Sequence, residues 1–221
     1  MSEALLDRVE AAVKPRLRGV LHQVAFALAL VTGTVLICLS RGALQHVATS
    51  IYAASVVLLF GTSAAYHRGR WSPGAHAVMM RLDHSMIFIL IAGTYTPFAL
   101  VVLTGWVRWT IFGIVWGGAF AGIAARNAVH RPPRWVFTGL YLGLGWLALG
   151  VLPQIWERGG PAVLVLLLVG GALYTLGAVV YARQRPNPSP RWFGFHEVFH
   201  AFTLAAFAVH YVAVSLAVYQ A

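Results

Sequence analysis

Residues 161–182, PAVLVLLLVGGALYTLGAVVYA, contain no charged side chain and decide the class of fold. A helix crosses the hydrocarbon core of a bilayer in about 20 residues, so this stretch is long enough to span a membrane. Of the 221 residues, 59% are hydrophobic and only 10% are charged, and comparable stretches recur along the chain. An all-α, polytopic membrane protein is predicted, a seven-transmembrane helix bundle with spans at 21–40, 43–66, 82–103, 106–125, 135–153, 161–182 and 196–219.

The basic residues alternate between the connections on the two sides of the predicted bundle. Of the 16 lysines and arginines, only Arg41, Arg108 and Arg158 lie in the odd-numbered connections. Because cytoplasmic loops carry the excess of positive charge, this pattern predicts a cytoplasmic N-terminus and an external C-terminus. The net charge of +10 is therefore a topology signal, and we expect no nucleic-acid partner. The predicted location is the bacterial plasma (inner) membrane.

The connections are too short for a folded soluble domain, so residues 21–221 are predicted to form a single transmembrane domain. Residues 1–20 form a separate N-terminal segment. Between residues 3 and 18, apolar positions recur at helical spacing between charges, which predicts a short amphipathic helix on the cytoplasmic membrane surface. Membrane lipids are the expected partners, and the sequence leaves the oligomeric state open.

Three histidines are predicted to meet at one membrane face. His196 and His200 lie one helical turn apart at the start of the last span, and His67 closes the second span. Ionisable side chains are costly inside a membrane, so this convergence indicates a functional site. Three imidazoles leave the fourth position of a zinc ion for a water, whose pKa the ion lowers to about 7. We therefore predict that His67, His196 and His200 bind Zn²⁺.

Two further side chains are predicted beside that water. Asp83, at the start of the third span, is the candidate general base, and Ser63 lies one turn before His67 on the same helix face. Both are assigned catalytic roles. The alternative for Asp83 is an ion pair with Arg81 or a nearby loop arginine at the headgroup level, in which case the histidines are interfacial residues.

The run from His196 to His200 also matches HExxH, the motif in which a glutamate serves as the base of a metalloprotease. Glu197 lies about 100° around the helix from His196, so its side chain could face either the metal or the headgroups. An intramembrane protease is therefore an alternative function.

The remaining histidines receive other interpretations. His210 lies about 15 Å along the helix from His200, too far for the same ion, so a structural role or a place in a cavity wall is expected. His84 either supports the site from behind Asp83 or packs against a neighbouring helix. Four more fall at span ends or in connections and are predicted to be solvated or to face the headgroups: His22, His46, His76 and His130.

In the order and spacing of its motifs, the chain resembles the bacterial hemolysin III family. The motifs are Ser63-Ala-Ala-Tyr-His67, Leu82-Asp-His-Ser85, residues 91–98 (IAGTYTPF), and His196-Glu-Val-Phe-His200 with His210 beyond it. That family is similar to the progestin and adiponectin receptors, and both are grouped with alkaline ceramidases as membrane metal-dependent hydrolases. The resemblance covers all seven predicted spans. It implies the three histidines as zinc ligands, with Ser63 and Asp83 beside the water; the receptors carry another residue in the place of Glu197.

The expected function is the metal-dependent hydrolysis of a lipid amide or ester bound in a cavity of the helix bundle. Zinc would polarise the carbonyl, and Asp83 would take the proton of the attacking water. Two other functions stay open: a non-enzymatic membrane-state sensor or receptor-like protein with structural zinc, and a cytolytic pore. Against the pore, no predicted span carries a continuous polar stripe.

Overall fold

The computed structural model describes residues 14–129 and 134–220. Most of the predicted amphipathic surface helix falls on residues 1–13, which lie outside the described residues. Within the described part the chain is helical, and its β structure is limited to one isolated bridge between Ser189 and Phe193. The all-α prediction is therefore confirmed for this part of the chain.

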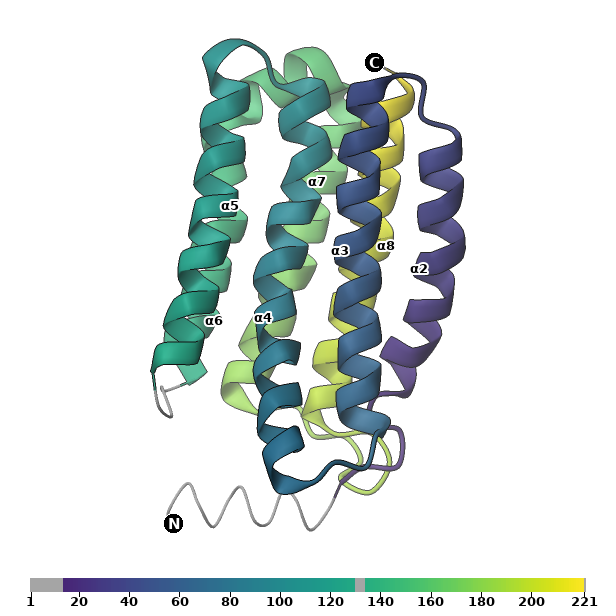
Figure 1. Cartoon of the computed structure of the whole chain (residues 1–221), viewed down its shortest axis with the longest axis vertical. Helices are drawn as coiled ribbons and strands as arrows, with labels where there is room; N and C mark the ends of the chain where they lie inside the picture. Colours follow the sequence, from purple (N-terminus) through teal and green to yellow (C-terminus); the bar gives the residue numbers. More distant parts are fainter. Residues whose placement is uncertain (1–13, 130–133, 221) are drawn as a thin grey trace.

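The helices form an elongated bundle with parallel and antiparallel neighbours (Figure 1). In chain order, the described elements are α2 (Val20–Cys38), α3 (Ala43–Arg68), α4 (Pro73–Pro97), η1 (Phe98–Val102), α5 (Gly105–Ala128), α6 (Arg134–Gly145), η2 (Trp146–Val151), α7 (Leu152–Arg183) and α8 (Phe195–Tyr219). η1 is a π-helical turn that directly follows Pro97, and η2 is a 3₁₀ helix between α6 and α7.

The outer surface of the bundle is apolar, as expected for a surface that contacts lipid. On α2, for example, Val24 is 53% exposed and Val31 is 64% exposed, and on α5 Phe120 is 58% exposed. In water, a helix that is hydrophobic on all sides would leave apolar side chains exposed even when one face is buried. Among the described residues, six helical segments are long and apolar enough to cross a membrane.

The predicted fifth and sixth spans are separated only by a short break at Gly160 and not by a longer non-helical connection. Residues Trp135–Arg183 form one helical segment of 49 residues that contains α6, η2 and α7. The six candidate spans include this segment once, whereas the sequence predicted two spans within it. Inside the segment, Gly160 has a non-helical backbone (φ 82°, ψ 169°) and is followed by Pro161, so α7 is kinked at this point.

The buried side chains form two apolar clusters. The larger one joins α2, α3, α4, α7 and α8 and includes Tyr52, Phe60 and Phe207. The smaller one joins α4, α5 and α6 around Phe88 and Phe137. α7 packs along α8, and α3 packs between α2 and α4, whereas α5 and α6 lie to one side (Figure 1).

One end of the bundle gathers several helix termini. α2, α4 and α8 begin there, and α3 and α7 end there, at the lower end of Figure 1. α8 ends at the opposite end of the bundle. The predicted site residues therefore come from helix termini that the fold places together.

Candidate metal centre

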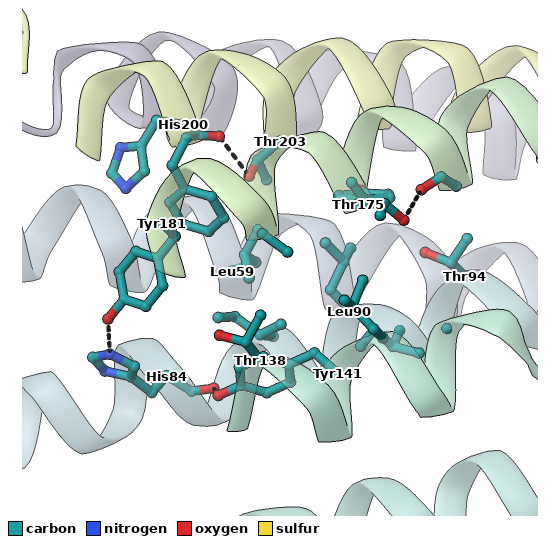
Figure 2. A pocket seen from close by; sticks show the side chains of 18 of the residues that line it. Leu59, His84, Leu90, Thr94, Thr138, Tyr141, Thr175, Tyr181, His200 and Thr203 are labelled. Carbon is teal, nitrogen blue, oxygen red and sulfur yellow. Dashed lines mark hydrogen bonds between the residues drawn. The ribbon is translucent and has the colours of Figure 1, made fainter. Parts of the chain in front are cut away.

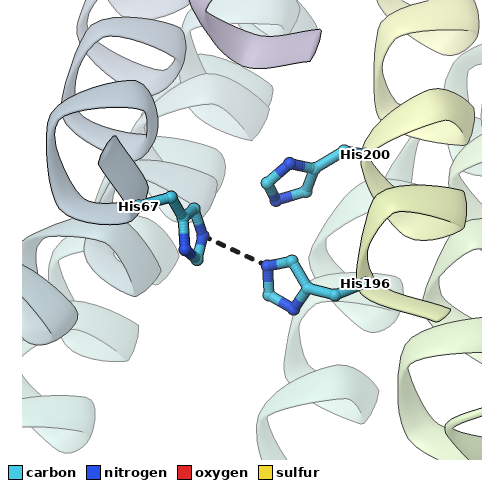
Figure 3. A group of neighbouring side chains, drawn as sticks. All are labelled: His67, His196 and His200. Carbon is cyan, nitrogen blue, oxygen red and sulfur yellow. Dashed lines mark hydrogen bonds between the residues drawn. The ribbon is translucent and has the colours of Figure 1, made fainter. Parts of the chain in front are cut away.

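Three imidazoles converge at this end of the bundle. His67 lies in the last turn of α3, and His196 and His200 lie in the first two turns of α8. One nitrogen of each ring lies within 4.8 Å of the others, and the rings point toward one another (Figure 3). The Nε2 atoms of His67 and His196 are 3.1 Å apart. His67 and His200 are buried, and His196 is partly buried.

This donor set fits a metal ion. Zinc–nitrogen bonds are about 2.0 to 2.1 Å long, so the nitrogens of a tetrahedral site lie about 3.3 Å apart. The observed separations therefore need only small side-chain rotations. Neutral imidazole is also a common ligand of zinc and of several other transition metals. The three histidines can thus hold a metal ion, as the sequence predicted.

Asp83 and Ser63 are adjacent to the three histidines. Oδ2 of Asp83 is 3.9 Å from Nε2 of His67, and Ser63 lies close enough to the Asp83 carboxyl group to interact with it. The Asp83 side chain is 15% exposed. Among the described residues, no arginine lies within ion-pair distance of Asp83, so the alternative of a pair with Arg81 is not observed.

His22 belongs to the same group of side chains, although the sequence did not single it out. It is buried, and its Nδ1 shares a hydrogen bond of 2.8 Å with the Ser63 hydroxyl. Its ring stacks on that of His200, with 3.6 Å between the ring centroids and 9° between the planes. The prediction that His22 is solvated or faces the headgroups is therefore wrong. The physical reason is that α2 begins beside the end of α3. This arrangement covers the His22 ring.

A signal for His22 was present in the sequence. It lies at the start of the first predicted span, and this end meets the same membrane face as His67 and His196. His46 and His76 are exposed, as expected. His130 lies outside the described residues.

Glu197 does not face the imidazoles. Its Oε1 lies 2.5 Å from Nε of Arg18, and its Oε2 accepts the backbone N–H of Gly194 at 2.8 Å. The side chain is 1% exposed. Of the two directions that the helix geometry left open, the side chain takes neither: it is buried against the segment that precedes α2.

An elongated cavity extends from the site between α4, α6, α7 and α8 (Figure 2). It contains about 1210 Å³ of space between protein atoms, its open side included. Asp83 and His200 line one end, and Thr94 and His210 line the other. From Asp83 to Thr94 the rise along α4 is about 17 Å. Most of the wall between these ends is aliphatic or aromatic, so the cavity suits a long apolar ligand.

Hydrogen bonds connect the helices that form the wall near the site. Nδ1 of His84 donates to the Met80 carbonyl at 2.7 Å, so its Nε2 accepts from the Tyr181 hydroxyl at 3.3 Å (Figure 2). The Tyr141 hydroxyl donates to the His84 carbonyl at 3.1 Å. His84 thereby links α4 to α6 and α7. Farther along, His210 lines the cavity, and its Nε2 donates to the Leu167 carbonyl at 3.2 Å.

Fold and site together define a class: a helical, multi-pass membrane protein with a three-histidine cluster at one end of an apolar cavity. The chain belongs to the haemolysin-III related family, whose model matches residues 11–211. The resemblance found in the sequence motifs is thereby confirmed.

Named relatives support the same family. The chain is 33% identical over 168 residues to Hemolysin-3 of Bacillus cereus, covering 76% of this chain and 74% of that protein. It is 30% identical over 168 residues to a Hemolysin-3 homolog of Bacillus subtilis, with 76% of each chain covered. The human monocyte to macrophage differentiation factor is 26% identical over 202 residues, covering 87% of this chain and 79% of that protein.

Proposed function

We propose that the protein is a zinc-dependent hydrolase of a lipid amide or ester in the bacterial plasma membrane. The observation that carries this proposal is the position of three histidines and Asp83 at one end of an elongated apolar cavity. The cavity provides a place for an acyl chain. The polar cluster lies where the head of such a lipid would be placed.

His67, His196 and His200 would hold the zinc ion. When bound, zinc supplies a Lewis acid that polarises a carbonyl and makes water more acidic. The carboxylate of Asp83 is the group that takes a proton from the attacking water. The Ser63 hydroxyl lies beside this carboxylate, and Nδ1 of His22 shares a hydrogen bond with that hydroxyl. Ser63 and His22 thus orient the base.

The cavity wall determines which substrate is accepted. Aliphatic and aromatic side chains such as Leu59 and Leu90 line its middle (Figure 2), so an acyl chain displaces little ordered water there. The same wall limits the access of bulk water to the site. We therefore propose a substrate with one long apolar chain next to the scissile bond.

We also propose seven membrane crossings, with the N-terminus in the cytoplasm. A straight helix of 49 residues would be about 73 Å long, more than twice the roughly 30 Å thickness of the hydrocarbon core. The break at Gly160 divides the segment Trp135–Arg183 into parts that fit two crossings. The start of α2 and the end of α8 lie at opposite ends of the bundle, which supports an odd number of crossings (Figure 1).

The decisive test of the hydrolase is the substitution Asp83→Asn, which keeps the shape of the side chain and removes its basicity. We expect full zinc content and a loss of turnover of about 10²- to 10⁴-fold, the usual contribution of a general base. Zinc is measured by elemental analysis, and turnover is measured on a panel of lipid amides and esters in detergent. Unchanged turnover in this variant would remove Asp83 from the mechanism.

The same assays separate the alternatives. A metalloprotease predicts that Glu197→Gln abolishes activity while Asp83→Asn does not, but Glu197 is already engaged by Arg18 and Gly194. A structural zinc between α3 and α8 predicts bound metal with no turnover of any lipid. A cytolytic pore predicts that the purified protein releases dye from liposomes.

A further inference from the structure

Residues 14–19, which precede α2, have no role in the proposed function but lie against the metal centre; we call this segment the clasp. The backbone N–H groups of Arg16 and Leu17 donate to the carbonyls of Arg191 and Trp192 at 3.0 and 3.2 Å. The Arg16 guanidinium lies 4.6 Å from the centre of the Trp192 ring. The clasp is thus bound to the connection that leads into α8.

Gly19 brings the clasp against a predicted metal ligand. Its φ of 80° is a left-handed conformation that favours glycine. A Cβ atom added at Gly19 would lie 2.7 Å from Cβ of His67, closer than two side chains can approach. The clasp therefore passes directly beside His67, and this approach requires a residue without a side chain.

Arg18 connects the clasp to the first turn of α8. Its Nε lies 2.5 Å from Oε1 of Glu197, and the two side chains are 20% and 1% exposed. The other oxygen of Glu197 accepts the N–H of Gly194, which is the N-cap of α8. A buried carboxylate is costly unless it is paired, so Arg18 stabilises Glu197 in this position. Glu197 is the direct neighbour of His196.

The charges around the pair support this arrangement. Partial burial, together with the positive charges of Arg18 and Arg68, lowers the pKa of Lys14. Cationic groups are therefore crowded at this end of the bundle. Glu197 places a negative charge among them, and the ion pair holds it next to the metal centre.

We propose that Arg18 is a positioning residue of the metal centre: through Glu197 it fixes the first turn of α8 and with it the orientation of His196. This inference rests on the proposed metal site. Groups that orient metal ligands typically change metal affinity by about 10- to 100-fold when they are removed. Arg18 and Glu197 are thus expected to act on zinc binding without touching the ion.

The test compares Arg18→Met with Arg16→Met, an arginine of the same clasp that contacts Trp192 and not Glu197. Zinc affinity is measured by chelator competition, ligand geometry by the visible spectrum of the cobalt(II)-substituted protein, and stability by thermal unfolding of the metal-free protein. We expect Arg18→Met to weaken zinc binding about 10- to 100-fold and to change the cobalt spectrum. Arg18→Lys should recover most of the affinity, and Arg16→Met should behave like wild type.

A double-mutant cycle tests whether Arg18 acts through Glu197. Glu197→Gln keeps an oxygen for the Gly194 N–H but removes the charge that pairs with Arg18. We expect this variant alone to weaken zinc binding at least tenfold, and Arg18→Met to add no further loss in its presence. If the losses of zinc affinity in the two single variants instead add up in the double variant, Arg18 does not act through Glu197.

The outcomes distinguish this inference from the proposed function. If Arg18→Met lowers only the melting temperature and leaves the zinc affinity and the cobalt spectrum unchanged, Arg18 has a structural role and the inference fails alone. If Arg18→Met does not fold, unaltered zinc affinity in Glu197→Gln refutes it. If the wild-type protein binds no zinc, the inference and the proposed function both fail.

Discussion

The three histidines of the site come from two helices that are far apart in the sequence. His196 and His200 are four residues apart on α8, so their common helix face is fixed by local geometry. His67 comes from α3 and reaches them only because that helix ends where α8 begins. His22 adds a stacked ring to His200 and a hydrogen bond to Ser63. At the scale of single residues, the site thus combines a local motif with contacts between distant segments.

Removal of His67 should abolish tight metal binding. We expect His67→Ala to lower zinc affinity by more than about 100-fold, because it removes a ligand and not merely a group that orients one. The matched control is His76→Ala, an exposed histidine at the same end of the bundle. Zinc content after purification and chelator competition measure the effect. A full complement of tightly bound zinc in His67→Ala would contradict the proposed site.

Glycines set the distance between neighbouring helices at particular points. A Cβ atom at Gly122 in α5 would lie 2.4 Å from two ring carbons of Phe88 in α4, and that ring is fully buried. At Gly117 in the same helix, nothing lies within 4 Å of an added Cβ atom. The packing of α5 therefore requires glycine at position 122 but not at position 117. The sequence does not show this difference.

This difference gives a prediction at the scale of the element. Gly122→Ala should destabilise the protein by about 1 to 3 kcal/mol, because the buried Phe88 ring must move to make room. Gly117→Ala should be neutral or stabilise α5 by up to about 1 kcal/mol, since alanine favours helix. Thermal unfolding in the same detergent compares both variants with the wild type. Equal effects of the two substitutions would be inconsistent with the packing of α4 against α5.

For the whole molecule, the number of crossings decides on which side of the membrane each end of the bundle lies. The positive charges predict that the start of α2 lies in the cytoplasm, together with the ends of the helices that carry the histidines. Whether the segment Trp135–Arg183 crosses once or twice then determines the side of everything that follows it.

Reporter fusions measure this directly. With seven crossings, a phosphatase that is active only outside the cytoplasm should be active when fused after Gly160 and after the end of α8. The same reporter should be inactive when fused after Ala128, which serves as the internal control, and after Arg183. An inactive reporter after the end of α8 would instead show an even number of crossings.

The sequence by itself determined the helical membrane class and the grouping of the three histidines. Each apolar span can be recognised by itself, because the bilayer requires about 20 apolar residues in every crossing helix. The alternation of positive charge between the connections predicts which span ends lie at the same membrane face. For this reason His67, His196, His200 and Asp83 could be placed at one depth without a structure. The family followed from the same motifs, because their order and spacing are directly visible in the chain.

Only the tertiary structure decided how neighbouring helices face one another. The burial of His22, the pairing of Glu197 with Arg18 and the contact of Gly122 with Phe88 all depend on the rotation and register of packed helices. In an apolar span every face carries similar side chains, so hydropathy does not encode that rotation.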